Sequence, residues 1–468
     1  MGEVSLVWLR NDLRLADNPA LFAAHQGGGE VLALYVHEAG SAVRAPGAAA
    51  RWWLHHSLNA LGKDLAEIGI KLLIRQGEAA SVVCEVAREH GASQVFWNRR
   101  YAPAEREIDA SVKTTLKEGG VDAHSFPGNV LVEPWEIATG QGKPYSVYTP
   151  FWKNLRNMHI PVPLGRPAAQ GLLAYAEPDS GYQAPKWSVK LKPYWSIGEQ
   201  AAALALTRFL DENLSDYPQG RDFPRREATS RLSPHLRFGE ISVRQLWHTA
   251  QALAHADHRK QELVDKFLSE LAWRDFNYHQ LYHRTDIATA PMQPKYAAMP
   301  WRVAARDLAA WQQGRTGIPL VDAGMREMWE TGFMQNRVRM LTASLLTKNL
   351  LVDWRQGEQW FWDCLIDADI ANNPANWQWV AGSGMDASPY FRIFNPVTQG
   401  ERFDAEGDYV RRWVPELDEL PDPWIHQPWA APGDVLAKAG VQLGSTYPLP
   451  IVDLKQSRQR ALDAVRSL

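Results

Sequence analysis

The sequence predicts an N-terminal α/β domain with a parallel sheet and an all-helical C-terminal domain, separated by a long connector. Three observations predict this organisation. Short apolar runs alternate with helical segments over residues 1–132, prolines interrupt residues 133–199, and apolar residues recur every three to four positions over residues 200–468. With 468 residues and 45% hydrophobic content, the chain is long enough to bury more than one core.

Five short runs of apolar, β-branched or aromatic residues predict strands in the first domain, at 4–9, 30–37, 70–75, 94–98 and 121–126. Helical periodicity between them predicts helices at 47–68 and 103–118. Such alternation is typical of a parallel sheet with crossover helices. The Gly27-Gly28-Gly29 run precedes a predicted strand instead of joining a strand to a helix, and no Walker A sequence is present. The common nucleotide-binding loops are therefore not expected here.

The connector and the second domain differ in periodicity. Residues 133–199 combine repeated prolines with Tyr and Trp, which indicates a packed surface loop rather than a free linker. The predicted helices beyond it are 200–213, 240–254, 260–283, 304–313, 320–331, 333–351 and 357–366. A tail rich in Pro and Trp begins near residue 396, and a last helix is predicted at 454–467.

Composition limits the classes of function. The two cysteines, Cys84 and Cys364, lack the spacing of zinc ligands, so neither a disulfide framework nor a metal site is predicted. No apolar stretch approaches the ~18 residues that cross a bilayer, and no signal pattern is present, which predicts a soluble, intracellular protein. A net charge of −3 is unusual for a dedicated nucleic-acid binder. Five arginines nevertheless gather within residues 221–237, a pattern that favours phosphate binding and an ordinary solvated loop equally.

Three hydroxyl side chains, Thr229, Ser230 and Ser233, lie just before a predicted helix. Hydroxyls and free backbone N–H groups at a helix start can bind a phosphate. The same residue types are preferred N-caps, and the local sequence favours that simpler interpretation. The 21 tryptophans are unusually many, and core packing must account for most of them.

A dense cluster of acids, amides and indoles fills residues 362–379, which read WDCLIDADIANNPANWQW. Together with residues 8–19 (WLRNDLRLADNP), 229–236 (TSRLSPHL), 272–276 (AWRDF) and 382–396 (GSGMDASPYFRIFNP), it resembles the photolyase/cryptochrome family over essentially the whole chain. The resemblance is greatest to the bacterial photolyases closest to plant cryptochromes, the class III type. It implies a light-driven enzyme that splits cyclobutane pyrimidine dimers in DNA with FAD bound in the helical domain.

The resemblance assigns ten positions to FAD. The phosphate and adenine side is matched by Tyr217, Thr229, Ser230, Leu232, Ser233 and Arg274, the flavin ring and ribose by Arg339, Asp367 and Asp369, and flavin N5 by Asn373. Without the resemblance, Arg339 and Asp367 would be an ordinary ion pair, and Asn372-Asn373-Pro374 would be a turn. Plant cryptochromes place Asp at the position of Asn373, so the neutral amide favours repair over signalling.

Three tryptophans, Trp301, Trp354 and Trp377, match the electron-transfer chain of the family. Their separations, 53 residues from 301 to 354 and 23 from 354 to 377, are those of the family. The resemblance implies that they reduce photoexcited flavin and take no part in the repair step. Each indole considered alone would more often be plain core.

Two predicted helices carry an unusual mixed face. Glu270, Trp273, Arg274 and Asn277 share a face through their spacing, and Asn336 and Met340 lie one turn apart. The resemblance implies that Glu270 and Asn336 bond the pyrimidine edges, Trp273 and Trp379 stack on the extruded dimer, Met340 makes an apolar contact, and Arg337 meets a phosphate. Gln335, where relatives often have His, departs from the pattern.

Two other functions stay open. A blue-light photoreceptor is disfavoured by the missing C-terminal extension, and repair of (6-4) photoproducts by the missing histidines near Asn336. The resemblance also implies an antenna chromophore in the α/β domain, methenyltetrahydrofolate or alternatively 8-hydroxy-deazaflavin. No match names its ligands, and Glu105, one candidate, is otherwise a solvated helix residue. A monomer that acts on UV-damaged DNA in the bacterial cytoplasm, at the nucleoid, is expected.

Overall fold

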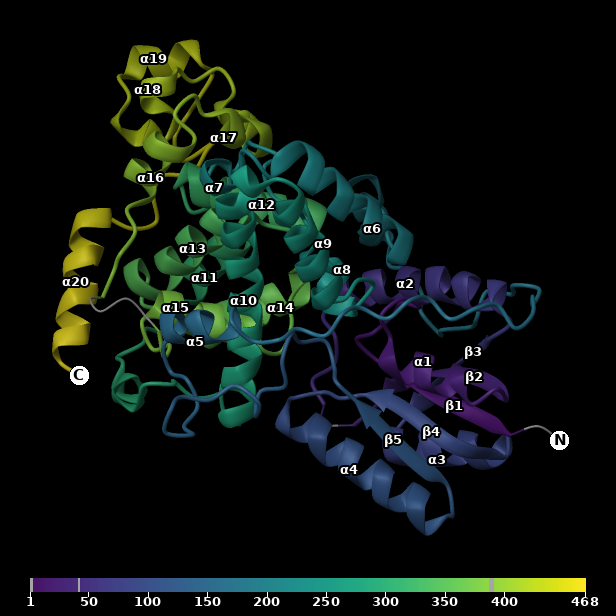
Figure 1. Cartoon of the computed structure of the whole chain (residues 1–468). Helices are drawn as coiled ribbons and strands as arrows, with labels where there is room; N and C mark the ends of the chain where they lie inside the picture. Colours follow the sequence, from purple (N-terminus) through teal and green to yellow (C-terminus); the bar gives the residue numbers. More distant parts are fainter. Residues whose placement is uncertain (1–2, 41–42, 387–390) are drawn as a thin grey trace. The chain divides into compact units, whose positions relative to one another are not determined.

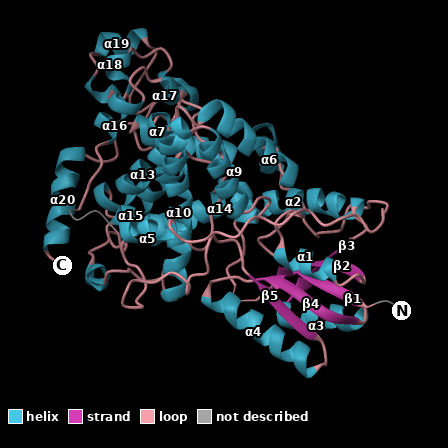
Figure 2. Ribbon diagram, in the orientation of Figure 1, coloured by secondary structure: helices cyan, strands magenta, loops and turns pink. Residues whose placement is uncertain are grey.

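The computed structural model describes residues 3–40, 43–386 and 391–468. Residues 387–390 of the predicted family motif lie outside the described residues. Contacts divide the chain into two compact units: unit 1 comprises residues 1–215 and 230–285, and unit 2 comprises residues 216–229 and 286–468. The strands all lie in the first part of unit 1, and helices and loops make up the rest of the described chain (Figures 1 and 2).

Five parallel strands form one sheet in unit 1, in the order β3-β2-β1-β4-β5. They are β1 (Val4–Leu9), β2 (Glu30–Glu38), β3 (Lys71–Gly77), β4 (Ala92–Asn98) and β5 (Asp122–Phe126). The connecting helices are α1 (Pro19–Gln26), α2 (Ala48–Glu67), α3 (Ala79–Glu89) and α4 (Pro103–Glu118). The central strand β1 is buried from its second residue onward, as expected for a parallel sheet. These bounds confirm every predicted strand and both predicted helices.

The other regular elements of unit 1, among the described residues, are helices joined by loops. Its helices are α5 (Tyr148–Leu155), α6 (Glu199–Arg208), α8 (Ser233–Phe238), α9 (Val243–Ala256) and α10 (Gln261–His283), with a π-helical turn at Phe209–Asn213 and short 3₁₀ helices at Lys186–Tyr194 and His258–Lys260. The predicted connector thus contains only α5 and one 3₁₀ helix among its described elements. This agrees with its high proline content.

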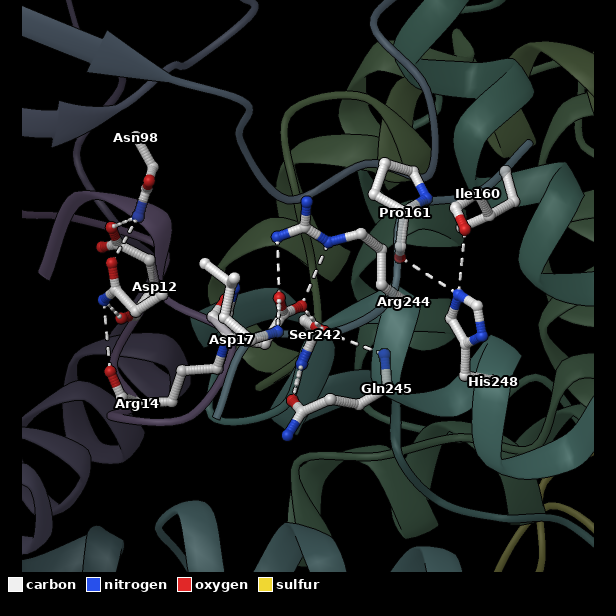
Figure 3. Close-up of polar contacts among 12 residues, drawn as sticks. Asp12, Arg14, Asp17, Asn98, Ile160, Pro161, Ser242, Arg244, Gln245 and His248 are labelled. Carbon is white, nitrogen blue, oxygen red and sulfur yellow. Dashed lines mark hydrogen bonds and ion pairs between the residues drawn. The ribbon is translucent and has the colours of Figure 1, made fainter. Parts of the chain in front are cut away.

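A buried polar network joins the loop after β1 to α9 within unit 1 (Figure 3). Arg244 makes two hydrogen bonds to the Asp17 carboxylate, at 3.1 and 3.0 Å. The Ser242 hydroxyl donates to the same carboxylate and accepts from Gln245 N–H, so it also caps α9. Because this network spans more than two hundred positions of sequence, periodicity could not show that α8, α9 and α10 group with the sheet. The boundaries predicted at residues 132 and 199 stay a prediction.

The regular elements of unit 2 are all helices among its described residues, as predicted, apart from one isolated bridge between Leu443 and Tyr447. Its helices are α7 (Tyr217–Gly220), α11 (Ala305–Gln312), α12 (Pro319–Thr331), α13 (Asn336–Ser344), α14 (Trp354–Cys364), α15 (Asn372–Ala381), α16 (Pro396–Phe403), α17 (Asp408–Trp413), α18 (Asp422–Ile425), α19 (Gly433–Lys438) and α20 (Leu454–Arg466). A π-helical turn, Leu345–Asn349, continues α13, and short 3₁₀ helices lie at Pro294–Ala298, Pro415–Leu417 and Pro428–Ala430. Most of these helices contribute to one core that includes Val338, Leu346 and Trp377, whereas Ala461 and Ala464 of α20 pack in a separate cluster with Met299 and Leu351. Across the described residues, no helix is both long and apolar enough to cross a membrane.

Candidate flavin and DNA site

The predicted site residues fall into two groups, one in each compact unit. Unit 1 carries Ser230, Leu232, Ser233, Glu270, Trp273 and Arg274, and unit 2 carries the other predicted FAD and substrate residues. Among the described residues, no cluster of three or more His, Cys, Asp or Glu side chains could hold a metal ion.

The hydroxyl-rich segment enters the six-residue helix α8 through a left-handed turn. Arg231 has a φ of 51°, which is uncommon for a residue with a side chain. Leu232 then occupies the N-cap position, and its side chain makes no capping hydrogen bond. Ser230 Oγ accepts a long hydrogen bond from Leu232 N–H at 3.4 Å. The interpretation of these hydroxyls as ordinary N-caps is therefore wrong.

Arg274 is buried in α10 and is only partly satisfied. Its Nη1 donates to the carbonyl oxygen of Asn129 at 2.6 Å, and its guanidinium lies 4.8 Å from the ring centre of Tyr278. Its Nη2 is also buried and has no hydrogen-bond partner among the described residues. Because buried guanidinium nitrogens almost always have an acceptor, this nitrogen fits an anionic or carbonyl group of a ligand.

The neighbouring Asp275 anchors the segment that carries Asn129. Its Oδ1 accepts from Leu131 N–H at 2.5 Å, and burial raises the pKa of this carboxyl to about 7. The backbone around residues 129–131 is thus held against α10 from both Arg274 and Asp275.

The four residues predicted to share a mixed face of α10 differ in how exposed they are. Glu270 and Trp273 are half-buried, whereas Arg274 and Asn277 are buried. Glu270 accepts a hydrogen bond from Lys266 Nζ at 2.7 Å. The indole of Trp273 lies parallel to the ring of Tyr148 in α5, with 3.7 Å between ring centres and 9° between planes. Tyr148 was not among the predicted site residues, because a pairing across 125 positions (148 to 273) leaves no local signal in the sequence.

In unit 2, Arg339 and Asp367 form the predicted ion pair. Arg339 makes two parallel hydrogen bonds to the carboxylate, at 3.1 and 2.9 Å, and its Nε donates to Met334 O at 2.6 Å. This bidentate geometry fixes the guanidinium plane. Asp369 is engaged differently, since its Oδ1 accepts from Ala371 and Asn372 N–H groups at 2.8 and 2.6 Å. Asp369 therefore holds the start of α15.

Asn373 lies in the first turn of α15, so the interpretation of Asn372-Asn373-Pro374 as a turn is wrong. The Asn373 side-chain amide is buried, and its Nδ2 donates to Glu358 twice, to the backbone carbonyl at 3.0 Å and to Oε1 at 2.7 Å. Both hydrogens of the amide nitrogen are thereby used, which leaves Oδ1 as the group for a ligand. Glu358 was not among the predicted site residues, although its position among the tryptophans of α14 was a usable signal.

The three predicted electron-transfer tryptophans pack on the core of unit 2. Trp354 and Trp377 are buried, and Trp301 is half-buried. Among the described residues, Trp377 makes its ring contacts with Phe361 at 4.9 Å and Trp311 at 6.1 Å, and not with Trp354 or Trp301. A Cβ at Gly357 would lie 2.2 Å from the Trp377 ring, so only glycine allows this indole to approach α14 so closely.

The predicted substrate residues of α13 lie at its start. Asn336 is exposed, and its amide lies 3.9 Å from Met340 Sδ, which confirms that the two side chains meet. Arg337 is not free, because its Nη2 lies 2.7 Å from Asp222 Oδ2 and its guanidinium packs 4.7 Å from the ring centre of Phe403. Gln335, the departure from the family pattern, caps the helix by accepting from Arg337 N–H at 2.6 Å.

Three more of the predicted site residues, Trp379, Tyr217 and Thr229, lie in unit 2. Trp379 is half-buried and lines a small pocket with Tyr296, Lys348 and Arg392. Tyr217 is buried at the start of α7, with the guanidinium of Arg221 5.3 Å from its ring centre, and Thr229 is half-buried.

Protein groups contact all five arginines of residues 221–237. Arg221 packs on Tyr217, Arg225 pairs with Asp408, Arg226 pairs with Asp216, Arg231 packs on Trp195, and Arg237 donates to Asn11. The segment is therefore less available to phosphates than its sequence indicates.

A second polar cluster lies beyond the carboxyl ends of β1, β2 and β4 in unit 1. Arg100 pairs with Glu38 and Asp109, and the guanidinium of Arg10 lies 4.0 Å from the ring centre of Trp8. Trp8 Nε1 is buried and has no hydrogen-bond partner within the described residues.

Glu105 adjoins this cluster, and its prediction as a solvated helix residue is wrong. It is half-buried and accepts from Ala102 N–H at 3.2 Å, and burial raises the pKa of its carboxyl.

Two family models match the chain, "FAD binding domain of DNA photolyase" over residues 267–467 and "DNA photolyase" over residues 5–168. A deoxyribodipyrimidine photo-lyase of Agrobacterium fabrum is 46% identical over 467 residues, 98% of this chain and 97% of that protein. Cryptochrome-1 of Arabidopsis thaliana is 37% identical over 492 residues, 100% of this chain and 71% of that protein. The crystal structure of a bacterial class III photolyase from Agrobacterium tumefaciens superposes with a TM-score of 0.94 at 46% identity, covering 100% of this chain and 98% of that one.

Proposed function

Because the chain belongs to the photolyase/cryptochrome family, we propose that it is a deoxyribodipyrimidine photolyase that splits cyclobutane pyrimidine dimers in DNA under blue light. Bound, reduced FAD supplies an electron to the dimer under light, and the two ring bonds of the dimer open. The electron then returns to the flavin, so the reaction has no net redox change. One chain acts on one lesion as a monomer, in the bacterial cytoplasm where the DNA lies.

The observation that carries the proposal is the buried amide of Asn373. Glu358 accepts both hydrogens of Nδ2 and leaves Oδ1 to accept a hydrogen bond from the reduced flavin ring. A neutral amide adds no negative charge beside a flavin that must stay reduced to donate an electron. An aspartate at this position would add that charge or carry a proton.

The remaining cofactor residues fit a large, charged ligand. Arg274 offers a buried Nη2, without a hydrogen-bond partner in the described part of the chain, that a phosphate or a ribose oxygen would satisfy. The Arg339 guanidinium is held in one plane by Asp367, so it can present its edge to a flat ring without reorganisation. These roles rest on the match to family positions and on the donor chemistry of the side chains.

The substrate residues supply aromatic faces and polar edges. Trp273 and Trp379 are half-buried indoles, each able to stack on an unpaired pyrimidine. Glu270 and Asn336 bond the pyrimidine edges, and Met340 makes an apolar contact. Extrusion of a dimer costs less than extrusion of a normal base pair, because the damaged step is already poorly stacked.

We also propose an antenna chromophore in unit 1, methenyltetrahydrofolate rather than 8-hydroxy-deazaflavin. The direction of the crossovers reverses between the adjacent strands β1 and β4, and ligands of such sheets bind beyond the carboxyl ends of the strands at this point. Trp8, the penultimate residue of β1, has a buried Nε1 with no hydrogen-bond partner among the described residues, which supports a polar ligand near this end of the strand. An absorption spectrum of the purified protein separates folate from deazaflavin, and a spectrum with flavin bands alone would contradict the antenna.

Repair itself is tested with a duplex that contains one thymine dimer. The protein with reduced FAD should remove the dimer under blue light, leave it intact in the dark, and bind this duplex more tightly than the undamaged one. Equal affinity for both duplexes with no loss of dimer on illumination would contradict the proposal and favour a blue-light photoreceptor.

A further inference from the structure

Tyr148 occupies one face of the Trp273 indole inside unit 1. The two rings are nearly parallel, with 9° between planes and 3.7 Å between centres, which is closer than most aromatic pairs. The Tyr148 hydroxyl donates to the carbonyl oxygen of Ser269, one turn before Trp273 in the same helix. Tyr148 is therefore attached to α10 both through its ring and through its hydroxyl.

Phe276 of α10 makes edge-to-face contacts with both Tyr148 and Trp273. Its ring lies 5.8 Å from Trp273 at 82° and 5.9 Å from Tyr148 at 75°, both edge-to-face contacts. Tyr148 and Phe276 are buried, whereas Trp273 is half-buried. Among the described residues, no second ring stacks on Trp273, so its indole has one face packed in the protein and one face without an aromatic partner.

We infer that Tyr148 is a positioning residue for lesion recognition, acting through Trp273. This inference rests on the proposed function, in which Trp273 stacks on an extruded pyrimidine. A half-buried indole without Tyr148 could rotate about its side-chain bonds, and that freedom would be lost when a base stacks on it. Tyr148 removes this freedom before DNA arrives, because it fixes the plane of the indole in advance.

The inference predicts a specific division of effects. Loss of the Tyr148 ring should weaken binding of dimer-containing DNA, because stacking on Trp273 then requires ordering. Binding of undamaged duplex should be unchanged, since no extruded base meets the indole. The rate of repair at saturating DNA should also be unchanged, because the electron-transfer step does not use Tyr148.

The test is a set of titrations at one salt concentration with dimer-containing and undamaged duplexes. Tyr148→Leu should raise the Kd for the dimer roughly 2- to 10-fold, the range for loss of one aromatic pair. Tyr148→Phe keeps the ring and should rescue discrimination. Phe151→Leu is the matched control, because Phe151 is a buried ring of the same helix that packs on Phe276 and His279 and not on Trp273. Phe151→Leu should lower the melting temperature without changing discrimination.

A double-mutant cycle with Trp273→Ala separates the possible failures. Tyr148→Leu should have no further effect in the Trp273→Ala background. A persistent loss there, or equal losses for both duplexes, would overturn the positioning role. The positioning role would also be overturned if Tyr148→Leu kept the wild-type affinity for the dimer while Trp273→Ala lost it. If Trp273→Ala itself keeps full affinity for the dimer, the assignment of Trp273 in the proposed function fails as well. Should Tyr148→Leu not fold, Tyr148→Met gives the same comparison.

Discussion

Glu358 of α14 accepts both N–H groups of the Asn373 amide, one through its backbone carbonyl at 3.0 Å and one through its carboxylate at 2.7 Å. Glu358→Leu removes one of these acceptors and leaves a buried amide hydrogen unsatisfied, so we expect the free energy of unfolding to fall by about 1–3 kcal/mol. Repair should fall too, because Asn373 is no longer held in one orientation. Glu358→Gln keeps an acceptor oxygen and is the control. Urea unfolding and repair assays of both variants check this, and equal behaviour of the two would contradict the orienting role.

The tryptophan chain predicts a separation of photoreduction from repair. Trp301→Phe, Trp354→Phe and Trp377→Phe should each block light-driven reduction of FAD, since phenylalanine preserves most packing but is much harder to oxidise. Repair by each variant should survive when FAD is reduced chemically. Trp247→Phe is the control, because Trp247 is a buried indole of α9 that matches none of the three electron-transfer tryptophans. Light should reduce the FAD of this variant normally. Loss of repair in chemically reduced Trp301→Phe would show that the residue has a different role.

His279 predicts a stability that depends on pH. Its Nε2 accepts from Tyr145 N–H at 2.9 Å and its Nδ1 donates to Pro134 O at 3.1 Å, an arrangement that requires the neutral ring. Burial and the nearby His283 lower its pKa to about 4, below the ordinary value of 6.5. The stabilisation is therefore present above about pH 6.5 and is lost as the pH falls toward 4, by up to about 3 kcal/mol.

Unfolding in urea at about pH 8 and at about pH 5 measures this dependence. His279→Gln cannot gain a proton, and it should lose less stability than the wild type over the same interval. An equal loss in both proteins would assign the acid sensitivity to other groups.

The fold was largely predictable because its signals are local. Short apolar, β-branched or aromatic runs predict the strands, and spacings of three to four predict the helices of both units. The residues alone predicted an ion pair of Arg339 and Asp367, which the structure contains. By contrast, the stacking of Tyr148 on Trp273 and the hydrogen bonds of Glu358 to Asn373 depend on how helices pack, and packing between distant segments leaves no periodic trace in sequence.

The partners of charged side chains were the other feature that could not be predicted from the sequence. The sequence presents Arg337 as a free cation, and nothing near it in the chain shows that Asp222 is its partner. Thr229, Ser230 and Ser233 failed as N-caps for a related reason, since the left-handed turn at Arg231 is followed by Leu232 at the N-cap position and Ser233 as the first residue of α8. Local propensity was overridden by backbone geometry there.

The ion pair of Arg337 and Asp222, with 2.7 Å between Nη2 and Oδ2, makes the last prediction. If Arg337 meets a phosphate, Arg337→Gln should weaken binding of damaged and undamaged duplexes by the same factor. It should also reduce the slope of log K against log salt concentration by about one. Asp222→Asn leaves the guanidinium without its competing carboxylate and should strengthen binding of both duplexes by about 1.5- to 5-fold, the range of partly exposed ion pairs. Titrations at several salt concentrations measure both effects. An unchanged salt slope in Arg337→Gln would show that the arginine only secures α13 to Asp222.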